Sequence, residues 1–232
     1  RWWLRHHAFK SPSWWPWRCG YCHHPIRGGC LMADPAYIVD GVLTDGEAWV
    51  GIATTTLGVD TATVTFTSTD DGQVGDFSQY MDLVSVCYVR SDRSPAEVDD
   101  GFGARFNGDT EAAVKYKIQR LQGNGSIVNA AAINGWASTG SGWLAYISAA
   151  DAATNVFDAV VSHFFDINSG KYQSYVSQGA SDRNGAGLAQ IYSGTWLEQA
   201  AITSIEFYPT YGSNLVAGSS ISLFGILPRM VA

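Results

Sequence analysis

The residues whose types and spacing are best suited to chemistry lie near the start of the chain. Cys19 and Cys22 are followed directly by His23, which is the spacing of a c-type haem attachment site. With His24 and Cys30 they also offer enough ligands for a tetrahedral zinc site. A haem protein would in addition need an apolar helical pocket and an export signal, and the sequence contains neither. Metal or haem binding is therefore one interpretation of this segment, and we predict a chain without a cofactor.

The composition of residues 1–31 supports two other interpretations. This segment holds five of the nine Trp and five basic residues but no acid, whereas from Met32 onward 21 acids meet nine basic residues, a net charge of -12. In one interpretation the segment is translated upstream sequence, since Arg27-Gly28-Gly29 can be encoded by a purine run resembling a ribosome-binding site just before Met32. In the other it is an arm that anchors the protein in a neighbouring subunit. The anchoring side chains would be Trp2, Trp3, Trp14, Trp15 and Trp17, joined by Tyr37, Ile38 and Val39 of the acidic linker 32–47.

Beyond Met32 the sequence offers few catalytic candidates. His163, the one histidine there, is expected to be a structural residue with a satisfied side chain. Cys87 is expected to be a core thiol, because no base lies near it in sequence. No phosphate loop, dinucleotide fingerprint, HExxH or GxSxG motif occurs. We therefore predict a protein that is not an enzyme, with no catalytic and no metal-binding residues.

Acidic residues form two kinds of cluster. Asp92, Glu97, Asp99 and Asp100 contain oxygen ligands for calcium, but their spacing matches no EF-hand loop and a solvated turn is favoured. Adjacent acids such as Asp99 and Asp100 could serve a glycan-degrading enzyme, yet neighbouring carboxylates usually point apart into solvent. Glycan cleavage therefore remains a less favoured alternative.

Aromatic residues support a second binding hypothesis. Several Trp and Tyr side chains could form a platform for sugar stacking, although packing in a core or subunit interface is the favoured interpretation. The candidate glycan contacts are Trp136 and Tyr211.

The elements that must position these residues are predicted to be strands. Only 15% of the residues are charged and 25 are glycine, which suits short strands and turns. Alternating apolar and polar residues, with turn residues between the runs, predict about ten strands in residues 48–232. We expect a hairpin through Gly58, a second turn at 123–126, and a loose connection over 127–142. The expected strands are 49–56, 60–67, 80–90, 102–106, 114–121, 143–148, 156–167, 172–178, 187–192, 201–208 and 219–226.

Charge and hydropathy exclude two classes of partner. The net charge of -7 argues against nucleic-acid binding. No apolar run reaches the roughly 18 residues of a membrane span.

Several short motifs together carry a resemblance to a known family. Arg90-Ser91 precedes ARFNGD at 104–109, RLQGNGS at 120–126, NSGKYQSY at 168–175 and YSGTW at 192–196. The chain closes with AITSIEFYPTYGSNLVAGSSISLFGI at 201–226, the most specific block. In this order the motifs are similar to small β-rich virion proteins of tailed bacteriophages, over roughly residues 49–226.

The resemblance implies an all-β, jelly-roll-like antiparallel sandwich without catalytic residues, preceded here by an extended N-terminal arm. It implies a virion structural protein, assembled in the bacterial host cytoplasm and displayed on the particle surface, often as a homotrimer. We expect a capsid decoration or cement protein bound to the major capsid protein or another virion protein. A tail-fibre or receptor-binding protein that contacts host glycan is the alternative.

Overall fold

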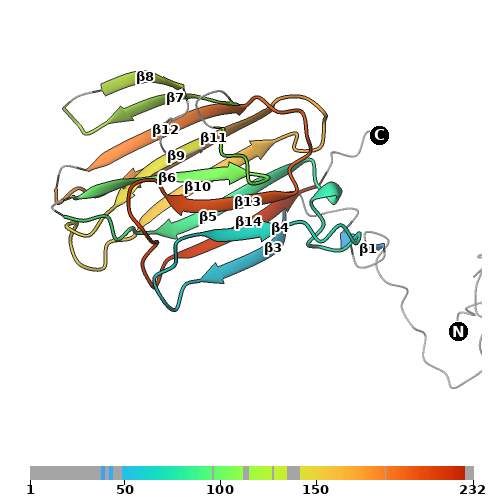
Figure 1. The fold of residues 1–232 in the computed structure, drawn as a ribbon, viewed down its shortest axis with the longest axis horizontal. Coiled ribbons are helices and arrows are strands. Elements are labelled where there is room, and N and C mark those ends of the chain that lie inside the picture. Colours follow the sequence, from blue (N-terminus) through green and yellow to red (C-terminus); the bar gives the residue numbers. More distant parts are fainter. Residues whose placement is uncertain are drawn as a thin grey trace, which may run out of the picture. The chain divides into compact units, whose positions relative to one another are not determined.

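The structure is a computed structural model, and it describes residues 38–39, 42–43, 49–95, 97–111, 115–126, 128–134, 142–185 and 187–227. The described chain consists of β-strands and one short 3-10 helix, η1 (Phe77–Gln79) (Figure 1). Within the linker, β1 (Ile38–Val39) and β2 (Val42–Leu43) pair antiparallel. The predicted all-β antiparallel sandwich is confirmed.

Two sheets of unequal width form the sandwich. The larger sheet has eight strands in the order β3-β14-β5-β10-β11-β12-β7-β8, and the smaller has four in the order β4-β13-β6-β9. The larger sheet contains β3 (Trp49–Thr56), β5 (Asp82–Val89), β7 (Tyr116–Gly123), β8 (Val128–Asn134), β10 (Asp158–Phe165), β11 (Gln173–Ser181), β12 (Leu188–Trp196) and β14 (Ser220–Ile226). The smaller contains β4 (Val64–Thr67), β6 (Asp99–Phe106), β9 (Gly142–Ser148) and β13 (Ser204–Pro209).

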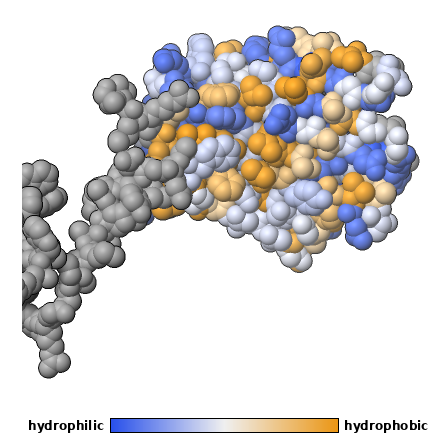
Figure 2. Space-filling model, turned by 180° about the vertical axis from the view of Figure 1, so that it is seen from behind, coloured by the Kyte–Doolittle hydropathy of each residue, from blue (hydrophilic) through white to orange (hydrophobic). Residues whose placement is uncertain are grey.

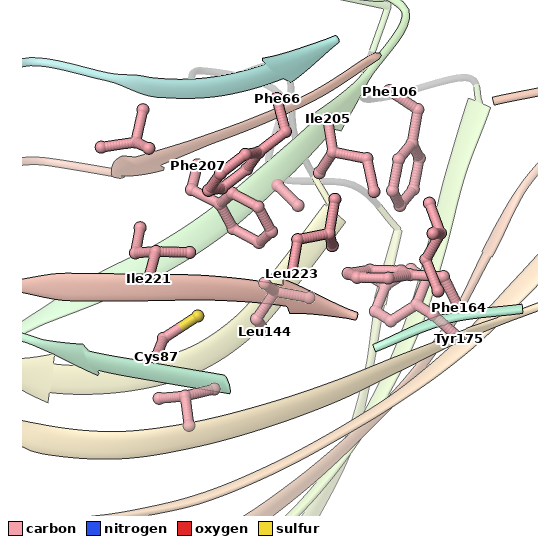
Figure 3. Packing of buried hydrophobic residues seen from close by; sticks show 14 of the residues in the cluster. Phe66, Cys87, Phe106, Leu144, Phe164, Tyr175, Ile205, Phe207, Ile221 and Leu223 are labelled. Carbon is pink, nitrogen blue, oxygen red and sulfur yellow. The ribbon is translucent and has the colours of Figure 1, made fainter. Parts of the chain in front are cut away.

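The core lies between the sheets because alternate residues of each strand point inward. Figure 3 shows Phe66, Ile205 and Phe207 of the smaller sheet meeting Ile221 and Leu223 of β14. Aromatic rings fill the centre: the Phe106 and Phe164 ring centroids lie 5.4 Å apart, edge to face. Such pairs add about 0.5–1.5 kcal/mol beyond the burial of their area.

The hairpin predicted through Gly58 is wrong. β3 pairs with β14 in the larger sheet, whereas β4 pairs with β13 in the smaller one. The intervening chain crosses between the sheets, and Leu57 is tied there by its N–H, which donates to the Ser219 carbonyl at 2.8 Å. Pairing follows burial of the inward faces, which a short-range turn signal does not report.

The chain enters and leaves the sandwich at the same end. Trp49, the first residue of β3, lies opposite Ile226, the last residue of β14. The other ends of these strands meet where Thr56 pairs with Ser220. The connections that contain residues 90–95, 149–157, 182–185 and 210–215 lie at this end, which we call the distal end.

Candidate functional site

Two acids, half-buried Asp92 and buried Asp100, connect the loops of the distal end. Asp92 accepts hydrogen bonds from the N–H groups of Ser213 and Asn214 at 2.8 and 2.9 Å. Asp100 is fully buried and accepts from the N–H groups of Tyr211 and Gly212 at 3.0 and 2.8 Å. The predicted solvated turn is therefore wrong for Asp100, which is buried and satisfies backbone donors of the 210–215 loop.

Burial of Asp100 disfavours the charged form of its carboxyl group. It raises the pKa of this carboxyl, and the hydrogen bonds from Gly212, Ser91 and Tyr211 oppose the rise. Since the folded-state pKa lies above the usual value, folding favours the protonated form. The free energy of unfolding therefore falls as the pH rises through the folded-state pKa of Asp100 and the carboxyl becomes charged.

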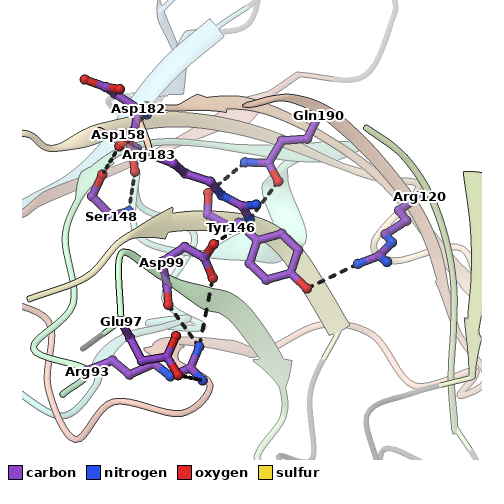
Figure 4. A network of polar contacts seen from close by, with 10 residues as sticks. All are labelled: Arg93, Glu97, Asp99, Arg120, Tyr146, Ser148, Asp158, Asp182, Arg183 and Gln190. Atoms are coloured by element: carbon purple, nitrogen blue, oxygen red, sulfur yellow. Dashed lines mark hydrogen bonds and ion pairs between the residues drawn. The ribbon is translucent and has the colours of Figure 1, made fainter. Parts of the chain in front are cut away.

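Two arginines link this end through aromatic rings (Figure 4). Arg93 pairs with Glu97 at 3.1 Å, as Figure 4 shows. Its guanidinium also lies over the Tyr211 ring, 4.6 Å from the centroid. Arg183 pairs with Asp99 at 2.8 Å and lies 4.9 Å from the Tyr146 ring centroid. Charged groups stacked on rings in this way fix the loops relative to β9.

Tyr211, a predicted glycan contact, is 41% exposed at this end and meets buried Trp143 edge to face at 6.1 Å. Its predicted partner Trp136 lies outside the described residues. Most other aromatic candidates belong to the interior, as the favoured interpretation predicted. Those buried are Trp143, Tyr175, Tyr192, Trp196 and Tyr208, while Tyr172 is exposed.

Side chains of the larger sheet close the free edge of β9. The amide of Gln190 on β12 accepts from Tyr146 N–H at 2.8 Å and donates to Tyr146 C=O at 2.7 Å, which imitates a neighbouring strand. Asp158 accepts from Ser148 N–H, and the Tyr175 hydroxyl donates to Trp143 C=O at 3.2 Å. An edge occupied in this way is protected from pairing with another chain.

Gln190→Leu is expected to lower the free energy of unfolding by roughly 2–4 kcal/mol, because two backbone groups of Tyr146 lose their partner and each buried unpaired group costs about 1–3 kcal/mol. Gln178→Leu, at an exposed position of β11, should stay within about 0.5 kcal/mol of the parent. Urea unfolding followed by circular dichroism measures both. Equal midpoints for the two variants would contradict a structural role of the Gln190 amide.

The remaining singled-out residues prove structural. His163 Nε2 lies 2.8 Å from Asp82 Oδ2, and the other Asp82 oxygen accepts from Asp166 N–H at 2.7 Å. Cys87 is buried, and burial raises the pKa of its thiol to about 12. A thiol with so high a pKa is a poor nucleophile. The predicted core position of Cys87 is confirmed, and His163 has a hydrogen-bond partner, as predicted.

Polar residues of the short motifs tie loops to distant backbone. The Arg90 guanidinium donates to four carbonyls of the 149–157 loop, at 2.7 to 3.2 Å. The Asn107 side-chain oxygen accepts from the N–H groups of Thr203 and Ser204. Asn168 Nδ2 donates to the carbonyls of Phe77, the first residue of η1, and of Tyr80, which follows η1, both at 3.0 Å. These motifs therefore specify loop geometry.

The outward face of the larger sheet combines apolar side chains with Ser, Thr and Gln and is nearly free of charge. Among the outward positions of its described strands, only Asp82, Lys117 and His163 carry acidic or basic groups. A row in register crosses the sheet through Val86, Val161, Gln178, Ile191, Leu121 and Ala130. The view from behind shows orange patches interspersed with pale and blue residues (Figure 2). The large exposed apolar side chains on this face include Val86, Tyr88, Leu121, Phe165, Val176 and Ile191.

The predicted anchoring residues lie mostly outside the described part of the chain. Ile38 and Val39 form β1, whereas Tyr37 and the five Trp residues of 1–31 are not described. Within the described ranges no three His, Cys, Asp or Glu side chains are grouped as a metal site requires. Nor is any helix of the described residues long and apolar enough to cross a bilayer. Comparison with protein-family models, curated proteins and solved structures found no match.

Proposed function

We propose that this chain is a structural protein of a bacteriophage particle, a capsid decoration or cement subunit that packs against neighbouring copies through the outward face of its larger sheet. The observation that carries the proposal is the row of uncharged, mostly apolar side chains across that face. Soluble monomers rarely expose apolar patches beyond a few hundred Å². A standard interface covers about 800 Å² on each partner, which is an area that an eight-stranded sheet can supply.

Charge favours this face as the contact between copies. Residues 32–232 have a net charge of -12, so two copies repel each other over most of their surfaces. The outward face offers apolar burial with one lysine, one aspartate and one histidine. The motif resemblance supplies the particle as the setting, and it implies a trimer.

Val86→Lys combined with Ile191→Lys is expected to convert the trimer to a monomer, because three copies would each bury two charges in an apolar contact. Light scattering after size-exclusion chromatography measures the mass. Thr65→Lys, on the exposed side of β4, is the matched control and should leave the trimer intact. A parent protein that is monomeric at micromolar concentration would contradict self-association.

The particle itself is tested separately. An antibody against residues 49–227 should label the heads of purified phage particles in electron microscopy. Labelling of tails would support the fibre alternative, and unlabelled particles would contradict a virion role. If particle binding survives deletion of residues 1–46, the N-terminal arm is not the anchor.

Exposed Tyr211 at the distal end gives the receptor-binding alternative its one supporting observation. A chain anchored at the Trp49 end would present this ring away from the particle. Saturable binding on a glycan array that is lost in Tyr211→Ala would favour this function.

A further inference from the structure

The smaller sheet leaves part of the larger sheet's inner surface without a facing strand. Eight strands lie against four, and the edge strand β9 packs mainly on β11 and β12. β7 and β8 continue beyond that edge. The inward positions of β7 therefore begin with Tyr116 and Ile118 in the core and end with half-buried Arg120 and Gln122 at its margin.

Arg120 differs from the other arginines of the described chain. Three of them, Arg93, Arg105 and Arg183, pair with carboxylates, and Arg90 donates to four carbonyls. Within the described residues no acid pairs with Arg120. Its Nη1 donates to the Tyr146 hydroxyl at 3.2 Å, and the guanidinium lies 5.9 Å from that ring's centroid (Figure 4).

Two buried polar atoms at this margin have no hydrogen-bond partner within the described residues, Arg120 Nε and Gln122 Oε1. The Tyr192 hydroxyl beside them interacts with the Arg120 guanidinium. Tyr192 is fully buried, and its ring lies among Arg120, Arg183 and Tyr146. Burial raises the pKa of Tyr192, so its hydroxyl keeps its proton and remains a donor. Native proteins rarely leave such groups unpaired unless a water, ion or ligand completes them.

We propose that this margin, formed by Arg120, Gln122, Tyr146 and Tyr192, binds the oxyanion group of an acidic sugar. Arg120 Nε and the Tyr192 hydroxyl are donors suited to a carboxylate, sulfate or phosphate. The Gln122 oxygen is an acceptor, which suits a hydroxyl beside the anionic group, as a sugar provides. The tyrosine ring of Tyr146 supplies an apolar wall next to the guanidinium.

The site does not depend on the outward face of the sheet or on self-association. A net charge of -7 repels anions at long range, so affinity must come from local hydrogen bonds. A phosphate group and a uronate carboxylate share the same donors, and the experiment separates them.

Isothermal titration of the full chain with glucuronate, glucose and inorganic phosphate tests the proposal. Glucuronate is expected to bind, and glucose to bind at least about tenfold more weakly, since a charged hydrogen bond contributes about 1.5–3 kcal/mol. Arg120→Gln should weaken glucuronate binding by about tenfold or more, and Tyr192→Phe by a smaller factor. Arg105→Gln is the matched control, because Arg105 already pairs with Glu206 at 2.7 Å, and it should bind as the parent does.

Unchanged denaturation midpoints of Arg120→Gln and Tyr192→Phe would show that the lost binding is not lost folding. Phosphate binding that equals glucuronate binding would overturn the sugar assignment. Absence of binding by both anions, or equal binding by Arg120→Gln and the parent, would overturn the site itself.

Discussion

Replacing Arg90 by methionine is expected to lower the free energy of unfolding by roughly 3–5 kcal/mol, the largest effect of any single polar residue described here. Arg90 is 9% exposed and its guanidinium donates to the carbonyls of Ala150, Ala152, Ala153 and Val156. Methionine fills much of the volume but leaves these carbonyls without their donor, and each buried unpaired group costs about 1–3 kcal/mol. Chemical denaturation measures the loss.

The 149–157 loop should also open more often in Arg90→Met than in the parent protein. Amide hydrogen exchange in residues 149–157 is expected to become faster in Arg90→Met, because the hydrogen bonds of the guanidinium hold this loop against the end of β5. Arg105→Met is the control, since the Arg105–Glu206 pair is partly exposed and such pairs contribute about 1 kcal/mol or less. If both variants lower the free energy of unfolding by the same amount, the four carbonyl contacts of Arg90 stabilise the protein no more than the exposed ion pair of Arg105 does.

Gly194→Ala is expected to be comparably damaging, for a steric reason. Gly194 on β12 lies opposite Tyr175 on β11, and the fully buried Tyr175 ring rests on the glycine. A methyl group on Gly194 would come within 3.0 Å of three atoms of that side chain, a distance that no relaxed packing tolerates. We expect a loss of about 3 kcal/mol, at the upper end of the overpacking range.

The steric explanation has its own test. In the Tyr175→Leu background the ring is absent, so the further effect of Gly194→Ala should fall below about 1 kcal/mol, which a double-mutant cycle measures. Gly58→Ala is the control, because a methyl group there meets no atom within 4 Å. If Gly194→Ala lowers the free energy of unfolding as much in the Tyr175→Leu background as in the parent, the clash with the Tyr175 ring is not the cause.

Most strands were predictable because alternation reports burial. In β12, Leu188, Gln190 and Tyr192 are buried and the residues between them are exposed, as a half-buried strand requires. β7 was predicted against a competing helical spacing, since the following turn residues favour a hairpin. That hairpin is present, and Asn124 Oδ1 accepts from Ser126 N–H at 3.1 Å in its turn.

β8 was missed because its sequence has no period. Ala130, Ala131 and Ala132 occupy its centre, and alanine carries neither alternation nor strand propensity. Its strand structure comes from pairing with β7 over residues 117–123. The same limit applied to the wrong hairpin at Gly58, because partner choice depends on residues more than a hundred positions away.

The candidate sites could be predicted from the sequence less well than the fold could. Arg120 looks like any exposed basic residue in sequence, and its lack of an acidic partner exists only in three dimensions. The outward apolar row likewise needs the register of six strands before Val86 and Ile191 align. Burial of Asp100 contradicted the charged-loop interpretation for the same reason, since its backbone donors come from residues 211 and 212.

The position of β14 determines when the larger sheet can form during synthesis of the chain. β14 lies between β3 and β5, so β3 has no neighbour in the sheet until residues 220–226 have been synthesised. Completion of the larger sheet must therefore await these residues, and its long-range pairings favour slow folding. Products that stop before residue 220 would expose the inner faces of β3 and β5 and become substrates for chaperones and proteases. The topology thereby keeps β3 from joining the larger sheet until residues 220–226 are present.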